Sequence, residues 1–264
     1  MKLKRVLVTL LSAMMIVLSF AGCSEEEMGI KLNVKQGDKF EVSANVTSNA
    51  VSGGEEVMNM NMDMGMNILY SEVSEDKVVS ESSFSDFGGN MSVMGQTIDL
   101  SSPEFKEALG NIKDIKMIVT EDGKGNVINV ETEGLEEGNA SFDLSSYFDS
   151  VSNNMNLFNN VDFKEGAIVE IPLKKLLGED KLAELGISDD VMIKIKPTKI
   201  TDKVIEGKVV SDDMNLDGNT MKIRMDFVID TEVGICTDLN YDIKVTMKDG
   251  SEGLVAMKMT IKKA

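Results

Sequence analysis

Apolar and polar residues alternate with a period of two along much of this chain, and the pattern is clearest in its C-terminal part. Three runs, 221–229, 239–247 and 255–261, each place apolar residues at every second position. Successive side chains of a β-strand point to opposite faces, so each run predicts a strand with one apolar and one polar face. A similar run spans 39–46. Sheets with one solvated face are typical of antiparallel proteins.

The connections between these runs are short. Asp-Gly pairs at 122–123, 217–218 and 249–250 lie between alternating runs, and a longer turn is expected over 231–234. Such pairs tolerate the positive φ that tight hairpins require. Strands that follow one another by short reversals leave no room for helical crossovers, which argues against a parallel α/β sheet. The fold class we expect is mainly β (α+β), with a curved antiparallel sheet or open half-barrel.

Three segments lack this two-residue alternation and predict a few short helices that cover the sheet. Residues 102–109 carry helix start and stop signals, 143–158 show apolar residues at helical spacing, and 174–185 predict one or two short helices. No long linker divides the chain, so we expect a single β-rich domain over 31–264. The alternative is two sheet halves that meet near 135–165.

The N-terminus has the features of an export signal. A basic start precedes an apolar run, Val6–Phe20, which is short for a membrane span and is followed by an Ala-Gly-Cys step ending at Cys23. This step resembles the lipobox of bacterial lipoproteins, whose cysteine is diacylated and becomes the mature N-terminus. Residues 1–22 are therefore predicted to be a lipoprotein signal peptide, Cys23 the lipidation site, and 23–30 a polar tether.

Charge and composition exclude several classes of function. The chain has 45 acidic and 27 basic residues, a net charge of −18, and no histidine. The acidic balance argues against nucleic-acid binding, and the lack of imidazole excludes Ser-His-Asp, Cys-His and two-His metal chemistry. We expect no enzyme activity and no cofactor. Because anionic headgroups repel an acidic surface, the acyl chains at Cys23 would have to hold the protein at the membrane.

The most unusual segment is a row of methionines. Met residues occupy every second position from 58 to 66, so their thioethers would share one face of a strand. Three interpretations stand: core filling, an adaptable pocket for lipids or other apolar ligands, and Cu(I) handling by soft thioethers. The candidate ligand-binding residues on this strand and the C-terminal strands are Met58, Met60, Met62, Met64, Met66, Met225, Phe227, Tyr241, Met257 and Met259.

Two further features are weaker candidates for a site. Asp213, Asn215 and Asp217 match the first half of a calcium loop, but its twelfth position, which should be glutamate, is Arg224. A hairpin turn with at most weak calcium binding is expected there. The alternation places Cys236 on the polar face of its strand. Its thiol would be exposed there, or unreactive if a helix covers that face.

Three short stretches resemble uncharacterised bacterial envelope lipoproteins. They are LNVKQGDKFEV at 32–42, LFNNVDFKEG at 157–166 and FVIDTEVG at 227–234. The last is also similar to a strand-turn-strand of LolA/LppX-type lipoprotein carriers. That resemblance implies an open, unclosed barrel with helices plugging a hydrophobic hollow for acyl chains. The chain lacks the tryptophan common in the middle motif, its Met-Asn run is unusual, and no catalytic residue carries over.

The function expected from these observations is that of a non-enzymatic protein, exported and lipid-anchored to a bacterial membrane, facing outside the cytoplasm. It would bind a lipid-like or apolar ligand in a Met-lined concavity. The alternative is a structural or interaction lipoprotein with a filled core and an acidic surface for a protein partner. The third hypothesis is Cu(I) handling.

Overall fold

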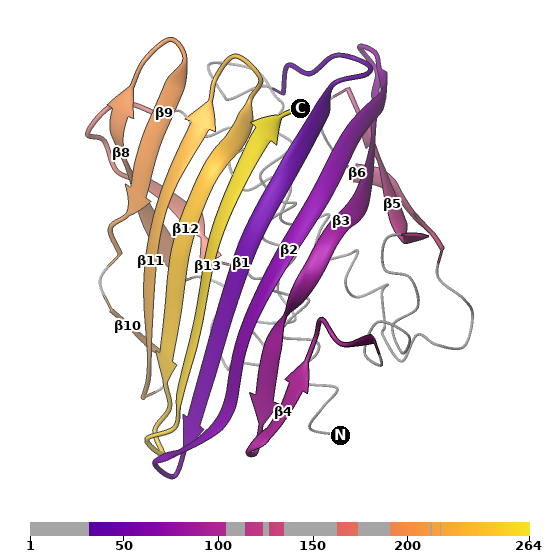
Figure 1. Ribbon diagram of the computed structural model, residues 1–264. Coiled ribbons are helices and arrows are strands. Elements are labelled where there is room, and N and C mark those ends of the chain that lie inside the picture. The colour runs from indigo at the N-terminus through magenta and orange to yellow at the C-terminus, as the bar shows by residue number, and fades with distance from the viewer. Residues whose placement is uncertain are drawn as a thin grey trace.

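One antiparallel sheet accounts for the regular structure of the described part of the chain (Figure 1). The structure is a computed structural model, and it describes residues 32–103, 114–123, 127–134, 163–173, 191–211, 213–216 and 218–264. The strands are β1 (Lys39–Ser52), β2 (Glu55–Val73), β3 (Lys77–Val93), β4 (Gln96–Asp99), β5 (Lys116–Asp122), β6 (Val127–Glu133), β7 (Val169–Pro172), β8 (Met192–Ile200), β9 (Val204–Val209), β10 (Met214–Leu216), β11 (Asn219–Asp230), β12 (Ile235–Thr246) and β13 (Glu252–Lys263).

The order of the strands shows how the two ends of the chain meet. The sheet runs β6-β5-β3-β2-β1-β13-β12-β11-β9-β8-β7, with β4 paired to β3 and β10 to β11. Strand β1 pairs with β13 from Phe40, opposite Lys263, to Val51, opposite Glu252, so the first and last strands lie side by side in the middle (Figure 1). The end strands β6 and β7 do not pair with each other. The predicted mainly β, antiparallel and open sheet is confirmed.

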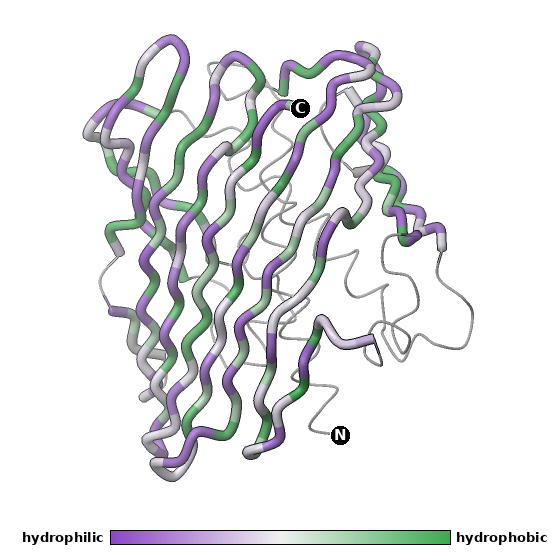
Figure 2. The backbone as a smooth tube through the Cα atoms, viewed as in Figure 1, coloured by the Kyte–Doolittle hydropathy of each residue, from purple (hydrophilic) through white to green (hydrophobic). Residues whose placement is uncertain are grey.

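Alternation separates the sheet into an inner, apolar face and an outer, polar face. The inner face carries the side chains of Val46, Met62, Tyr241 and their neighbours, and the outer face carries those of Asn45, Asp63 and their neighbours. Figure 2 shows the alternation of hydropathy along the central strands. The pattern follows from the two-residue period of a strand, which buries one set of side chains and leaves the other in water.

The registers align inner-face residues into rows that cross the sheet. One row joins five central strands through Met62, Val46, Met257, Tyr241 and Met225, which lie directly opposite one another in successive pairs. Each member is at most 2% exposed. Cross-strand neighbours of this kind stabilise a sheet by mutual packing. The core of the described part therefore lies on the inner face.

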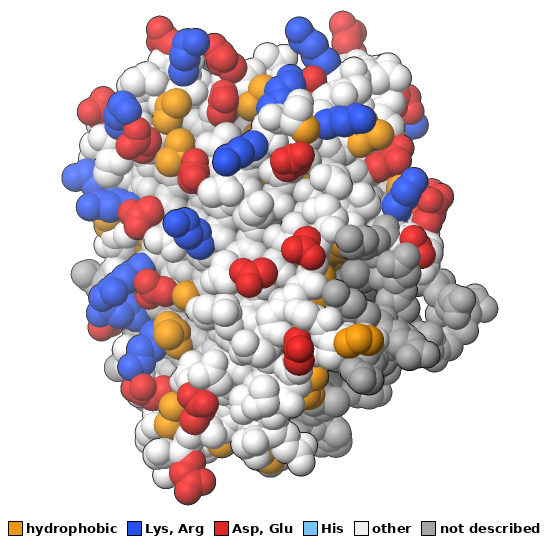
Figure 3. Space-filling view, in the orientation of Figure 1, with side chains coloured by type: hydrophobic (Ala, Val, Ile, Leu, Met, Phe, Trp, Pro, Cys, Tyr) orange, Lys and Arg blue, Asp and Glu red, His pale blue; other side chains and the backbone are white. Residues whose placement is uncertain are grey.

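The outer face is solvated and carries charges of both signs (Figure 3). Its ion pairs, such as Lys199–Glu206 and Lys77–Glu72, join side chains that are each about half exposed. Exposed pairs contribute little to stability, typically below about 1 kcal/mol. The outer face thus keeps the protein soluble on that side, and stability rests mainly on the inner face.

Two sequence predictions about the C-terminal strands are wrong in detail. A β-bulge shifts the register of β11 and β12, so that Val228 lies opposite Asp238 but Ile229 lies opposite Cys236. Residues directly opposite share a face, so the bulge turns Cys236 inward, where it is 1% exposed, instead of placing it on the polar side. Met247 was expected on the apolar face, but β12 ends at Thr246 and Met247 is 39% exposed in the following turn.

Several predictions concern segments outside the described residues. These are the signal peptide, Cys23 and the tether over 1–30, the helices over 143–158 and 174–185, and most of the helix over 102–109. The same holds for most of 135–165, where two sheet halves were considered. A search of the described residues finds no helix with the length and hydropathy to span a membrane.

Gly207 should tolerate no side chain, because of its place beneath an inner-face aromatic ring. It lies opposite Phe227, and a Cβ on Gly207 would meet the ring at Cζ and at Cε1, the latter at 2.8 Å. We expect Gly207→Ala to lower the free energy of unfolding by about 1–3 kcal/mol through overpacking. Gly253→Ala, where a Cβ meets nothing within 4 Å, is the matched control. Equal urea midpoints for both variants would contradict this packing.

Candidate functional site: the inner face

The methionine row of β2 lies on the inner face, as its spacing predicted. Met60, Met62, Met64 and Met66 are 3%, 0%, 5% and 7% exposed, and Met58, nearer the end of the strand, is half-buried. Their partners on β1 include Val46 opposite Met62 and Ala44 opposite Met64. These β1 residues are small or β-branched, so the flexible thioether chains lie beside short neighbours. The row forms one half of a continuous apolar surface.

The C-terminal candidates complete this surface. Met225, Phe227, Tyr241, Met257 and Met259 are all at most 2% exposed. Met257 and Met259 lie opposite Val46 and Ala44 on β1, whose other neighbours are the β2 methionines. The structure therefore places all ten predicted residues on one face, spread over β2, β13, β12 and β11 and linked through β1.

One polar atom stands out within this apolar surface. The hydroxyl oxygen of Tyr241 is buried and makes no hydrogen bond; among the described residues Thr132 Oγ1 is the other such side-chain atom. Burial raises the pKa of the Tyr241 hydroxyl, so it stays protonated. The sequence reasoning named Tyr241 only as an apolar contact. The sequence did contain a signal for more, because a tyrosine at a buried strand position brings a hydroxyl that usually needs a hydrogen-bond partner.

A buried carboxyl lies on β5, outside the methionine surface. Glu121 is 4% exposed, and burial, with a smaller contribution from Asp122, raises its pKa to about 8. Tyr70 is also buried, and the nearby Glu121 charge adds to the burial that raises the pKa of Tyr70. Sequence reasoning missed Glu121, although it shares the parity of Met117 and Val119, which are buried.

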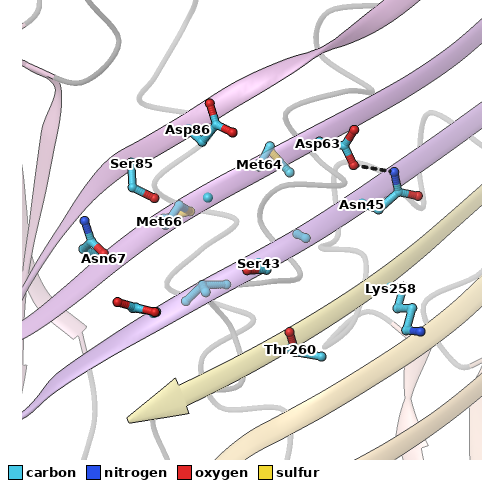
Figure 4. Close-up of a pocket in the computed structure, with 14 residues that line it drawn as sticks. Ser43, Asn45, Asp63, Met64, Met66, Asn67, Ser85, Asp86, Lys258 and Thr260 are labelled. Atoms are coloured by element: carbon cyan, nitrogen blue, oxygen red, sulfur yellow. Dashed lines mark hydrogen bonds between the residues drawn. The ribbon is translucent and has the colours of Figure 1, made fainter. Parts of the chain in front are cut away.

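The outer face carries a hollow of about 590 Å³ over β13, β1, β2 and β3 (Figure 4). Gly65 lies among its lining residues, and a Cβ there would meet Ser85 Oγ at 2.6 Å. Asn45 Nδ2 donates to Asp63 Oδ1 at 2.8 Å, drawn as a dashed line in Figure 4, and to Asn61 Oδ1 at 2.9 Å. Its outer-face lining is polar and acidic, with Lys258 as the one basic residue. Met64 and Met66 of the methionine row also line the hollow, together with Val42 and Ala44 of β1, although all four are buried.

The predicted metal candidates show no metal-binding geometry in the described residues. Asp213 is exposed, and its Oδ1 lies 2.9 Å from Lys222 Nζ, so a cation of the protein already engages it. The Asn215 side chain and Asp217 lie outside the described residues. No group of three or more His, Cys, Asp or Glu suited to a metal occurs in the part of the chain that the structure describes. Copper binding by the methionines alone stays a prediction.

Comparison with known proteins supports a likeness of fold alone. No family model matches the sequence, and no curated protein matches it. A solved structure described as showing lipid-protein interactions in lipovitellin aligns with 88% of this chain at 10% identity and a TM-score of 0.50. The chain spans 26% of the length of that lipovitellin chain.

Two other solved structures align with most of the chain but with low TM-scores. An outer membrane channel from Pseudomonas putida F1 aligns with 90% of this chain and 100% of its own at 9% identity and a TM-score of 0.24. A DUF1329 family protein from Desulfovibrio piger aligns with 96% of this chain and 90% of its own at 11% identity and a TM-score of 0.21. Scores this low carry no argument. The class that the fold and the site define is a large, open antiparallel sheet with one apolar, methionine-rich face.

Proposed function

We propose that this protein binds a lipid-like or other apolar ligand on its inner face and acts without catalysis. The observation that carries the proposal is the continuous methionine-rich surface formed by β2, β1, β13, β12 and β11. Methionine is unbranched and polarizable, so it adapts to ligands of varied shape. The fold likeness to lipovitellin, whose structure is described in terms of lipid–protein interactions, supports the same class of ligand.

The proposal includes a place in the cell. The N-terminal export signal and the lipobox-like step at Cys23 support an exported protein tethered to a bacterial membrane by acyl chains. The net charge of −18 for the full chain makes electrostatic attachment to an anionic membrane unfavourable. Such a tether would keep the apolar inner face within reach of lipids without inserting the sheet into the bilayer.

A second candidate is a structural or interaction protein with a filled core. It is favoured by the burial of the inner face, since Val46 and Met62 are 0% exposed. The ring of Phe163 also lies against that of Phe227, with centroids 6.2 Å apart. In this case the inner face would admit no ligand, and the acidic outer face would bind a protein partner.

Titration with a neutral apolar dye, N-phenyl-1-naphthylamine, separates the two candidates. We expect the delipidated protein to bind the dye saturably. Met257→Phe adds bulk to the inner face and should weaken this binding, because Met257 lies at the centre of that face and is 1% exposed. Leu254→Phe makes a comparable addition at an outer-face position that is 38% exposed, and should leave binding unchanged.

The outcomes of this titration are distinct. Saturable binding that is lost in Met257→Phe but kept in Leu254→Phe supports the ligand-binding function. A wild-type protein that gives no saturable fluorescence, while circular dichroism shows the intact sheet, overturns it and favours the filled core. Both variants need the same dichroism spectrum as the wild type for the comparison to hold.

A further inference from the structure

We infer that the Tyr241 hydroxyl is the hydrogen-bond donor for an uncharged carbonyl of the ligand, so that the inner face prefers acyl esters. This inference rests on the proposed function and adds to it the chemical class of the ligand. The ligand would carry a long apolar chain and an ester group, with the ester carbonyl oxygen accepting from Tyr241. No bond is made or broken in this step.

The position of Tyr241 supports this role, because its surroundings on the sheet are apolar. Met225 and Met257 flank it on β11 and β13, directly opposite in register. Along β12, the next inner-face residues are Leu239 and Ile243. None of these four side chains can accept a conventional hydrogen bond from a hydroxyl, apart from the weak thioether acceptors.

The sheet itself offers the hydroxyl no partner. The backbone around Tyr241 is paired on both sides, with β11 and with β13. Inward side chains stand roughly perpendicular to a sheet, so the hydroxyl is the atom of Tyr241 farthest from this backbone. A buried hydroxyl without a hydrogen bond is costly, and such a group in a native protein calls for an explanation. An acceptor on a bound ligand supplies one.

The charge of the inner face decides which acceptor fits. The buried polar or charged residues of the described part are Ser48, Ser82 and Glu121, and none of them is a cation. A fatty-acid carboxylate placed at Tyr241 would bury its charge with no buried counter-ion among the described residues, which is strongly unfavourable. An ester carbonyl accepts the same hydrogen bond without a charge. The observations therefore favour neutral acyl esters over free fatty acids.

Displacement of N-phenyl-1-naphthylamine by methyl palmitate and by palmitate tests the inference. We expect methyl palmitate to displace the dye from the wild type at lower concentration than palmitate at pH 8. Tyr241→Phe should weaken methyl palmitate roughly fivefold relative to the dye affinity measured for the same variant, the effect of losing one neutral hydrogen bond. Tyr70→Phe, which removes the hydroxyl of another buried inner-face tyrosine, should not change the methyl palmitate affinity.

A thermal melt of the ligand-free variants gives a second measurement. It distinguishes ligand binding by the Tyr241 hydroxyl from a role of that hydroxyl in the stability of the protein. Without ligand, Tyr241→Phe removes an unsatisfied buried hydroxyl, so its Tm should equal or exceed that of the wild type. A lowered Tm would mean that the hydroxyl stabilises the protein itself, which overturns the inference. An unchanged methyl palmitate affinity relative to the dye in Tyr241→Phe overturns it too and leaves the proposed function standing. Absence of dye and ester binding in the wild type overturns both.

Discussion

Replacing Met62 by alanine is expected to lower the free energy of unfolding by about 2–5 kcal/mol. Met62 is fully buried in the central row, between Val46 on β1 and Gly89 on β3. Gly89 has no side chain that could move into the space, so truncation would leave a cavity bordered on one side by backbone. Urea denaturation at neutral pH measures the change.

Two matched variants serve as controls for the Met62→Ala measurement. Met192→Ala makes the same truncation at a position that is 38% exposed, and it should cost well under 1 kcal/mol. Met62→Leu conserves most of the volume and should cost less than about 1.5 kcal/mol. If Met62→Ala were no more destabilising than Met192→Ala, the central row would not be the core of the sheet.

The second large effect is a loss of stability as the pH rises, caused by Glu121. Burial, and then the Asp122 charge, raise the pKa of Glu121 from 4.5 to about 8 in the folded protein. A raised carboxyl pKa means that the folded state holds the proton more tightly than the unfolded state. This contribution is therefore fully present below pH 4.5 and is lost as the pH rises towards 8. At about 1.4 kcal/mol per pKa unit, it amounts to several kcal/mol.

Glu121→Gln tests this contribution directly. Glutamine keeps the shape of the protonated side chain and cannot ionise, so the variant should match the wild type near pH 5 and exceed it near pH 9. Denaturant midpoints measured across this range give the profile. If the wild-type and variant profiles stay parallel, Glu121 is not buried as a neutral acid.

The alternation in the sequence was enough to predict the sheet and its apolar face. A two-residue period fixes which side chains share a face, whatever the neighbours of each strand are, so the methionines of β2 could be assigned to one surface. The same reasoning placed Met225, Phe227 and Met259 on the C-terminal strands. The hairpin-by-hairpin order followed from turn residues such as those around Gly250, whose φ is +81°.

Register and solvent exclusion could not be predicted in the same way. Local pattern does not reveal the pairing of β1 with β13, because it joins opposite ends of the chain. The bulge that turns Cys236 inward inserts one residue and reverses the parity that the pattern implies. The unsatisfied Tyr241 hydroxyl and the raised pKa of Glu121 depend on burial in the folded protein, which the alternation of a single strand does not report.

Native mass spectrometry tests the central claim, that the inner face takes an apolar ligand, most directly. The protein is delipidated, refolded, exposed to a total membrane lipid extract and separated from unbound lipid before measurement. We expect mass additions of defined lipids, released at raised collision energy and reduced in Met257→Phe. A single unliganded mass from a refolded protein with native dichroism would contradict the claim.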